Sequence, residues 1–183
     1  MGDPRKLRKK YKSPKRLWDK GRILEQSRLK REYGLKNMRE VWTAIQELRK
    51  VRREARRLLS LSEEERVVES KKVLNKLAKL GILSENASID EILSLTVRDF
   101  LERRLQTFIF RKGFAKTPSQ ARQLITHGFI SVSGRRTTSP NYLIRRGEET
   151  AIAYYKPINI SQQIQKEEAK QEPAAQKAEK VES

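Results

Sequence analysis

Apolar side chains recur every three or four positions through residues 37–112. That spacing puts them on one side of an α-helix, so the segment predicts a series of amphipathic helices. Asn37, Ser62 and Ser88 are each followed three positions later by Glu, as in a capping box at a helix start, and Thr96 opens a fourth helix. The predicted core positions are Met38, Val41, Trp42, Ile45, Leu48, Val51, Ala55, Leu58 and Leu59 in the first helix, Val68, Leu74, Leu77 and Leu80 in the second, Ile89, Ile92 and Leu93 in the third, and Val97, Phe100, Leu101, Leu105, Phe108 and Ile109 in the fourth.

After Gly113 the pattern changes. Residues 117–120 supply a Thr cap, a first-turn Pro and a Gln box partner, which predict a fifth helix that ends at Gly128. Residues 129–132 predict a short strand before a tight turn, and residues 150–155 predict a closing strand. The predicted fold class is therefore α+β, a helical body followed by a small module of two helices packed on a short, mostly antiparallel sheet.

Composition divides the chain into four parts. Residues 1–36 are predicted to be a basic N-terminal arm, residues 37–102 the helical body, and residues 103–160 the module. Residues 161–183 are rich in Gln, Glu, Lys and Ala and have few large apolar side chains, so this tail is predicted to be disordered.

Positive charge dominates the chain, because 42 Lys and Arg stand against 23 Asp and Glu and give a formal net charge of +19. A chain this basic repels itself until a polyanion neutralises it, and nucleic acid is a more frequent partner than an anionic membrane surface. Residues 1–31 hold thirteen of these cations and only three acids. With so little apolar content, the arm is expected to be extended and mobile on its own. It is either a phosphate-binding segment or a solvated basic tail.

No recognisable catalytic or metal-binding motif is present. There is no Cys, the one His is His127, and the chain lacks a Gly-rich phosphate loop and a nucleophile-elbow Ser. The acids at residues 63–65 are explained by a helix start, where they complement the dipole. No run of about 18 apolar residues and no signal-like apolar segment occurs. We therefore expect a cytoplasmic protein that is not an enzyme, needs no cofactor or metal, and does not enter a membrane.

The densest set of hydrogen-bond donors lies in residues 103–136. Arg104 and Arg111 are two helical turns apart, so they are expected to share a face. Arg122 lies on the next helix, and the amides at the start of that helix, near Thr117, can receive a phosphate. Such a convex basic surface suits the phosphates and shape of folded RNA better than base edges. The candidate RNA-binding residues are Arg8, Lys9, Lys10, Lys15, Arg16, Arg22, Arg49, Arg53, Arg56, Arg103, Arg104, Arg111, Lys112, Lys116, Thr117, Ser119, Arg122, Gln123, His127, Ser133, Gly134, Arg135 and Arg136.

Some of these positions, and two nearby aromatic residues, have structural explanations as well. His127 can cap the helix that ends at Gly128, where a protonated imidazole gains from the dipole, or it can contact RNA. Phe114 and Phe129 can stack on bases, but core packing is the stronger expectation for both.

The run RRLQTFIFRKGFAKTPSQARQLITHGFISVSGRR, residues 103–136, resembles the RNA-binding module named after small-subunit ribosomal protein four. That module also occurs in pseudouridine synthases, some tRNA synthetases and heat-shock RNA-binding proteins. The rest of the chain therefore has to distinguish between these families. The basic arm, the helical body and the segment TVRDFLERRLQTFIF resemble the ribosomal protein four family of archaeal type, over residues 1–160. The matching positions in the module are Arg104, Leu105, Arg111, Gly113, Phe114, Ala121, Arg122, Gln123, Leu124, His127, Val132, Gly134 and Arg135.

The resemblance implies a protein of the small ribosomal subunit that binds its rRNA directly, at a multi-helix junction of the 5′ domain, and nucleates assembly of the subunit body. It also implies contacts with ribosomal protein five and other small-subunit proteins, an influence on translational accuracy, and a place near the messenger RNA entry channel. The chain is not expected to form homo-oligomers.

Three other functions compete with this interpretation. An RNA-modifying enzyme would need a catalytic domain, and no uncommitted stretch could hold one. A general nucleic-acid or chromatin binder would be displaced from rRNA by duplex DNA. A membrane-surface role has least support, because the basic helix face lacks an exposed aromatic side.

Overall fold

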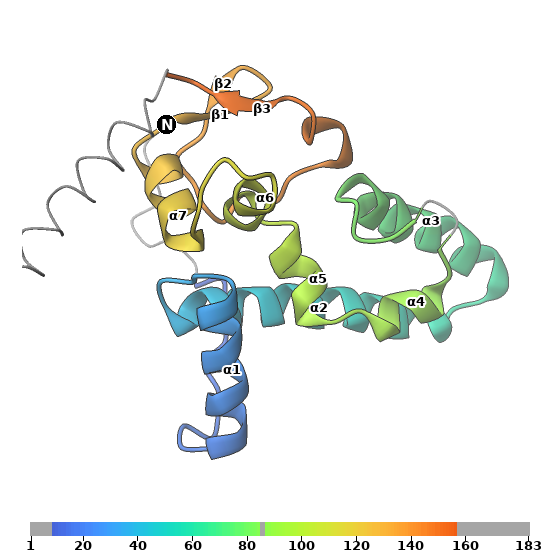
Figure 1. Cartoon of the computed structure of the whole chain (residues 1–183). Helices are drawn as coiled ribbons and strands as arrows, with labels where there is room; N and C mark the ends of the chain where they lie inside the picture. Colours follow the sequence, from blue (N-terminus) through green and yellow to red (C-terminus); the bar gives the residue numbers. More distant parts are fainter. Residues whose placement is uncertain (1–8, 85–86, 157–183) are drawn as a thin grey trace, which may run out of the picture.

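The computed structural model describes residues 9–84 and 87–156, and Figure 1 shows their arrangement. Helices come first and a small sheet follows, which confirms the predicted α+β class. Arg8 and the predicted tail lie outside the described residues. The elements are α1 (Lys20–Glu32), α2 (Met38–Leu59), α3 (Glu63–Lys79), α4 (Ile89–Ser94), α5 (Val97–Glu102), α6 (Leu105–Arg111), α7 (Pro118–Thr126), β1 (Ile130–Val132), β2 (Arg135–Arg136), the 3-10 helix η1 (Arg146–Glu148) and β3 (Ile152–Tyr154).

The long helix α2 is the spine of the helical body, and α1, α3, α4 and α5 all pack against it (Figure 1). The predicted apolar stripe of α2 is confirmed, because one side of the helix is buried along its length. The buried residues of α2 are Val41, Leu48, Val51, Ala55 and Leu58.

Two predicted core positions are wrong. Leu59, the last residue of α2, and Val68, in the first half of α3, are both exposed. The buried residues of α3 are Leu77 and Ala78, near its other end. Only that end of α3 contributes to the core it shares with α2 and α4, so helical spacing alone overestimates the buried length.

The N-terminal part of the chain contains a helix where an extended arm was expected. Asp19 caps α1 by accepting a hydrogen bond from the Arg22 amide at 3.4 Å. Tyr33, which follows the last residue of α1, is buried in one apolar cluster with Val41 and Leu101. These partners lie in α2 and α5, so the support for this helix comes from distant parts of the sequence.

The predicted fourth helix is in fact two helices, α5 and α6, separated at Arg103 and Arg104. The backbone of Arg104 is extended, with φ −74° and ψ 142°. The backbone here forms hydrogen bonds with another segment of the chain. The Leu105 amide donates to the Tyr142 carbonyl at 2.8 Å, and the Ile144 amide donates to the Arg103 carbonyl at 3.0 Å. The segment around Tyr142 thus replaces helical hydrogen bonds at the break.

The module combines α6 and α7 with an antiparallel sheet in the strand order β2-β1-β3. The hairpin turn lies at Ser133 and Gly134, which have φ angles of 50° and 75°. Two left-handed residues in succession are what a type I′ hairpin turn requires. The module's core consists of Leu105, Ile109, Ala115, Ala121, Leu124, Ile125, Ile130, Val132, Ile144 and Ile152.

Gly34 lies where the body meets the module, and it is sensitive to substitution. Its φ is +59°, and an added Cβ would lie 2.5 Å from Pro118 Cβ. We expect Gly34→Ala to lower the free energy of unfolding by about 2–5 kcal/mol, because left-handed strain of about 1–2 kcal/mol adds to a steric overlap of about 1–3 kcal/mol. Gly113→Ala is the matched control, since Gly113 also has a positive φ of +80° but nothing lies within 4 Å of its Cβ position. Urea unfolding followed by circular dichroism measures both losses, and equal losses would contradict the overlap.

Candidate nucleic-acid interface

Four polar side chains form a junction cluster between the body and the module: Glu40, Arg104, Gln106 and Arg122. The Glu40 carboxylate pairs with Arg104 Nη2 at 2.8 Å and with Arg122 Nη2 at 2.9 Å. Gln106 Nε2 donates to the carbonyl of Gly34 at 2.8 Å. The Arg104 side chain is only 2% exposed, so protein encloses its charge. The cluster therefore ties α2 to the start of α6 and to α7.

Glu40 does not complete the capping box predicted at Asn37, whose side chain makes no cap hydrogen bond. Two guanidinium groups use the carboxylate instead. Burial raises the pKa of Glu40, but hydrogen bonds from Arg122 and Arg104 outweigh that effect and hold the pKa below its ordinary value. At neutral pH the carboxylate is thus ionised, and this one negative charge bridges two guanidinium groups.

The prediction that Arg104 and Arg111 share an exposed face is wrong. The chain breaks between α5 and α6 at Arg104, and this side chain turns inward to Glu40. Arg111 is exposed and forms an ion pair with Glu102 at 2.9 Å. The two arginines therefore have different surroundings, and only Arg111 lies at the surface.

Arg103 and Lys112 both interact with Glu149 rather than standing free. Arg103 Nη2 lies 2.5 Å from the Glu149 carboxylate, and Lys112 Nζ donates to the Glu149 carbonyl. Arg103 is half-buried, whereas Lys112 is exposed. These contacts fasten the end of η1 to the region of α6.

The other candidate residues of the module face solvent. Lys116 and Arg135 are exposed, and neither has a carboxylate within ion-pair distance among the described residues. The Thr117 side chain caps α7, and Arg136 Nη2 donates to the carbonyl of His127 at 3.3 Å. The remaining exposed candidates here are Ser119, Gln123, Ser133 and Gly134.

Structural roles account for the aromatic residues of the module. Phe114 and Phe129 pack against its apolar core, and the Phe114 ring meets the Tyr154 ring edge-on at 5.1 Å between centroids. His127 is the C-cap residue of α7, and its amide donates to the Gln123 carbonyl at 3.0 Å. His127 is also exposed, so the cap does not remove it from the surface.

Cations also face solvent on the body and ahead of α1. Arg49, Arg53 and Arg56 are exposed on α2. Arg22 has an internal task, because its Nη2 donates to the carbonyls of Arg16 and Leu17 at 3.0 Å each and so holds the turn before α1. The exposed candidates ahead of α1 are Lys9, Lys10, Lys15 and Arg16.

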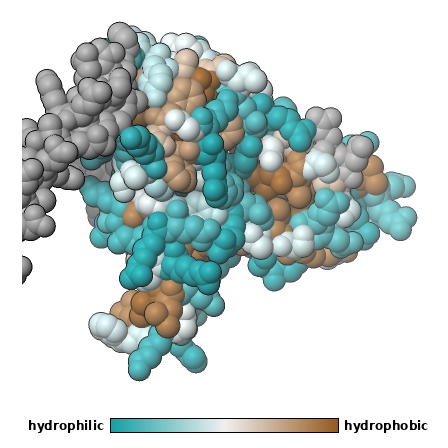
Figure 2. All heavy atoms as spheres, viewed as in Figure 1, coloured by the Kyte–Doolittle hydropathy of each residue, from teal (hydrophilic) through white to brown (hydrophobic). Residues whose placement is uncertain are grey.

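Trp18 was not among the predicted binding residues, yet it is 89% exposed, and Leu17 and Leu24 are exposed beside it. Figure 2 shows hydrophobic residues gathered at the free end of α1, with hydrophilic residues next to them. Lys15 and Lys20 lie close by in the sequence. An exposed aromatic ring among cations is a combination that stacks on unpaired bases. The signal was present in the sequence, as a Trp in a segment without apolar periodicity.

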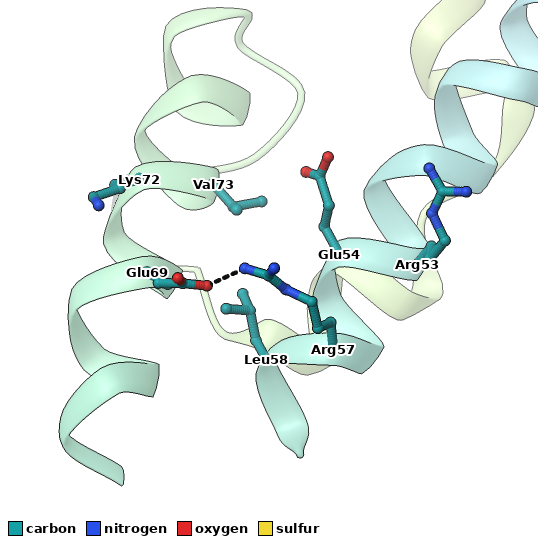
Figure 3. Close-up of a pocket in the computed structure, with 7 residues that line it drawn as sticks. All are labelled: Arg53, Glu54, Arg57, Leu58, Glu69, Lys72 and Val73. Atoms are coloured by element: carbon teal, nitrogen blue, oxygen red, sulfur yellow. Dashed lines mark hydrogen bonds and ion pairs between the residues drawn. The ribbon is translucent and has the colours of Figure 1, made fainter. Parts of the chain in front are cut away.

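The cleft between α2 and α3 has a volume of ≈ 460 Å³. Figure 3 shows Arg57 crossing it to Glu69, with Glu54 and Val73 pointing into the cleft and Lys72 pointing away from it. Acids and bases are mixed here, and no nucleophile lies beside a base. Within residues 9–84 and 87–156, no cluster of His, Asp and Glu is placed to hold a metal ion. No helix in that part of the chain has the length and apolar character to cross a membrane.

Comparison with known proteins identifies the family. A family model described as the S4 domain matches residues 103–149. Small ribosomal subunit protein uS4 of Ignicoccus hospitalis is 54% identical over 154 residues, which cover 84% of this chain and 93% of that protein. This chain belongs to the small ribosomal subunit protein uS4 family. The uS4 protein of Saccharolobus islandicus is 52% identical over 156 residues (85% and 86% covered), and that of Methanothermobacter thermautotrophicus is 44% identical over 165 residues (90% and 96% covered).

Membership in the uS4 family confirms the resemblance to ribosomal protein four of archaeal type. The chain is accordingly a structural, non-enzymatic protein of the small ribosomal subunit in the cytoplasm. The matched S4 domain begins at Arg103, the residue at which α5 and α6 separate.

Proposed function

We propose that this uS4 protein binds small-subunit rRNA directly, through exposed cations on the segment before α1, on α2 and on the module. The observation that carries the proposal is that cations such as Lys116 and Arg135 remain exposed and without a carboxylate partner in the described chain. A surface cation without an internal ion pair can bind a phosphate directly, because no ion pair within the protein has to be broken first. The proposed contacts are Lys9, Lys10, Lys15, Arg16, Arg49, Arg53, Arg56, Arg111, Lys112, Lys116, Thr117, Ser119, Gln123, His127, Ser133, Gly134, Arg135 and Arg136.

Four of the residues predicted from the sequence receive a different role in this proposal. Arg22, Arg103, Arg104 and Arg122 are half-buried or buried, and each has hydrogen bonds or ion pairs within the chain. We assign them to positioning the binding surface rather than to contacting RNA.

Family membership supports a wider proposal: binding at a 5′-domain junction, nucleation of subunit assembly, an effect on translational accuracy, contact with ribosomal protein five and proximity to messenger RNA at the entry channel. Reconstitution of the subunit with this chain omitted tests nucleation. If the other small-subunit proteins bind equally well without it, the nucleation proposal fails.

Competition between two polyanions tests direct rRNA binding. The chain is bound to a 5′-domain junction fragment of small-subunit rRNA, and unlabelled rRNA or duplex DNA is added at equal phosphate concentration. We expect rRNA to displace the fragment and DNA to leave most of it bound, because the geometry of folded RNA differs from that of duplex DNA. Equal displacement would favour the general nucleic-acid binder.

Paired variants refine the same experiment. Lys116→Gln with Arg135→Gln should weaken binding of the rRNA fragment by roughly tenfold or more at low salt, since two phosphate contacts are lost. Lys36→Gln with Lys71→Gln removes the same charge from exposed positions outside the proposed contacts and serves as the control.

A further inference from the structure

A basic groove that the sequence did not reveal lies between α3 and η1. Two adjoining cavities of ≈ 550 and ≈ 530 Å³ share Asn75, Lys79 and Arg145 in their walls. One wall is the end of α3, and the other is the segment that joins β2 to β3, which Figure 1 shows reaching from the module towards α3. We call this feature the α3 groove. It lies across the boundary between the helical body and the S4 domain.

Cations from both walls converge on the α3 groove. Lys72, Lys76 and Lys79 follow one another at spacings of four and three residues, so they lie on the same face of α3. Arg145 approaches from the opposite wall. All four side chains belong to exposed residues, and none has a carboxylate within ion-pair distance in the part of the chain that the structure describes.

Glu148, an acid in the wall of the α3 groove, already accepts hydrogen bonds from neighbouring groups. Both carboxylate oxygens of Glu148 accept hydrogen bonds from the Tyr142 hydroxyl, at 3.0 and 2.9 Å. One of them also accepts from the Arg145 amide at 3.1 Å. Glu148 therefore shapes η1, and it forms no ion pair with the four groove cations.

This distribution of charge differs from that of two neighbouring parts of the surface. In the neighbouring cleft between α2 and α3, Arg57 pairs with Glu69 across the opening (Figure 3). In the module, Arg103 and Arg111 each have a carboxylate partner. Four like charges in one concavity repel one another, and within residues 9–84 and 87–156 no carboxylate forms an ion pair with any of them. An external polyanion with regularly spaced charges would offset it.

We propose that the α3 groove binds the phosphodiester backbone of an RNA strand, with Lys72, Lys76, Lys79 and Arg145 as its phosphate contacts. Contacts to phosphate oxygens carry no sequence information, so the proposed contact is independent of the base sequence. Because its walls come from the body and from the S4 domain, a strand in the groove contacts both parts of the chain. The inference rests on the proposed rRNA binding and adds a site to it.

Salt titration of two charge-matched variants tests the proposal. The groove variant is Lys72→Gln with Lys76→Gln and Lys79→Gln, and the control is Lys36→Gln with Lys71→Gln and Lys156→Gln, all exposed positions. Each full-length protein is titrated with small-subunit rRNA over a range of salt concentrations. Loss of three contacts to a single strand should reduce the slope of log affinity against log salt by about 2, which corresponds to roughly 100-fold weaker binding at 0.1 M salt when affinities converge at 1 M. The control should keep the parent slope.

Lysine acylation of the parent protein provides an independent measurement. Bound rRNA should protect Lys72, Lys76 and Lys79 and leave Lys71 reactive. Circular dichroism of both variants checks that the fold is retained, and the acylation pattern needs no variant at all. If the parent binds rRNA but the groove and control variants have the same slope, the groove proposal is refuted and the proposed rRNA binding still stands. The same conclusion follows if the groove lysines stay reactive in the presence of rRNA. If the parent does not bind rRNA, the proposed function fails first.

Two further ligands separate RNA from other anions in the acylation assay. Inorganic phosphate and polyglutamate are added at the charge concentration of the rRNA. We expect neither to protect the groove lysines. Protection by phosphate equal to that by rRNA would make this a small-anion site, and protection by polyglutamate would point to an acidic protein partner. Either result would overturn the RNA assignment.

Discussion

Replacing Glu40 with Gln should lower the free energy of unfolding by about 3–5 kcal/mol. The substitution preserves size but removes the charge that pairs with Arg104 at 2.8 Å and Arg122 at 2.9 Å. Arg104 is 2% exposed, so water cannot replace the lost partner. A guanidinium left buried without a counter-charge costs far more than the loss of a surface ion pair. Urea unfolding at pH 7 measures the difference.

Glu47→Gln is the matched control for Glu40→Gln, because Glu47 lies on the same helix and pairs with Lys50 at 3.0 Å, but both side chains are well exposed. Its loss should be at most about 1 kcal/mol. A second variant, Glu40→Gln with Arg104→Met, should recover part of the stability, since the buried charge is gone. Small and equal losses for Glu40→Gln and Glu47→Gln would show that the junction cluster does not stabilise the fold.

Acidification should remove the contribution of Glu40 as well. The pKa of Glu40 in the folded chain lies below its ordinary value of 4.5, which applies when the chain is unfolded. A carboxyl with a lowered folded pKa contributes fully above the unfolded value, and its contribution disappears as the pH falls through the folded one. The stability difference between the parent and Glu40→Gln should therefore be constant near neutral pH and should shrink below about pH 4.5.

Affinity for small-subunit rRNA should fall by about 10³–10⁵-fold between 50 and 200 mM salt, if roughly 6–10 phosphate contacts form. Each contact releases a condensed counterion, so added salt opposes binding in proportion to the number of contacts. The chain has the charge for this, with a net +19 and unpaired cations before α1, on α2, on α3 and on the module.

Filter binding or fluorescence anisotropy at five or more salt concentrations gives the slope of log affinity. Circular dichroism across the same salt range verifies that the fold is unchanged, so that the slope reports binding alone. A nearly flat response would refute the electrostatic basis of the proposed function.

Some local patterns in the sequence predicted local structure correctly, although neither Asn37 nor Ser62 makes the cap hydrogen bond that its capping box predicted. The Ser88 and Glu91 capping box is present, the apolar stripe of α2 is buried, and Gly128 ends α7 with a φ of +74°. In each case the cause lies within a few residues of the effect. The hairpin at Ser133 and Gly134 belongs to the same group.

Features that depend on distant residues could not be predicted in this way. Arg104 looks like an exposed helical cation until Glu40, 64 positions earlier in the chain, is placed beside it. In the α3 groove, the helical period puts Lys76 and Lys79 on one face of α3, but only the fold brings Arg145 to the opposite wall. The net charge predicted a polyanionic partner. Only the structure shows which of the cations are buried and which are exposed.

The junction cluster also bears on what counts as an independent unit in this chain. The matched S4 domain begins at Arg103, but the carboxylate that pairs with Arg104 and Arg122 belongs to α2. A fragment cut at residue 103 would retain two guanidinium groups and lose their shared counter-ion. The boundary at which the family match begins therefore separates two guanidinium groups from the carboxylate that pairs with them in the folded chain. Glu40, Arg104 and Arg122 should consequently be inherited together, as one coupled set.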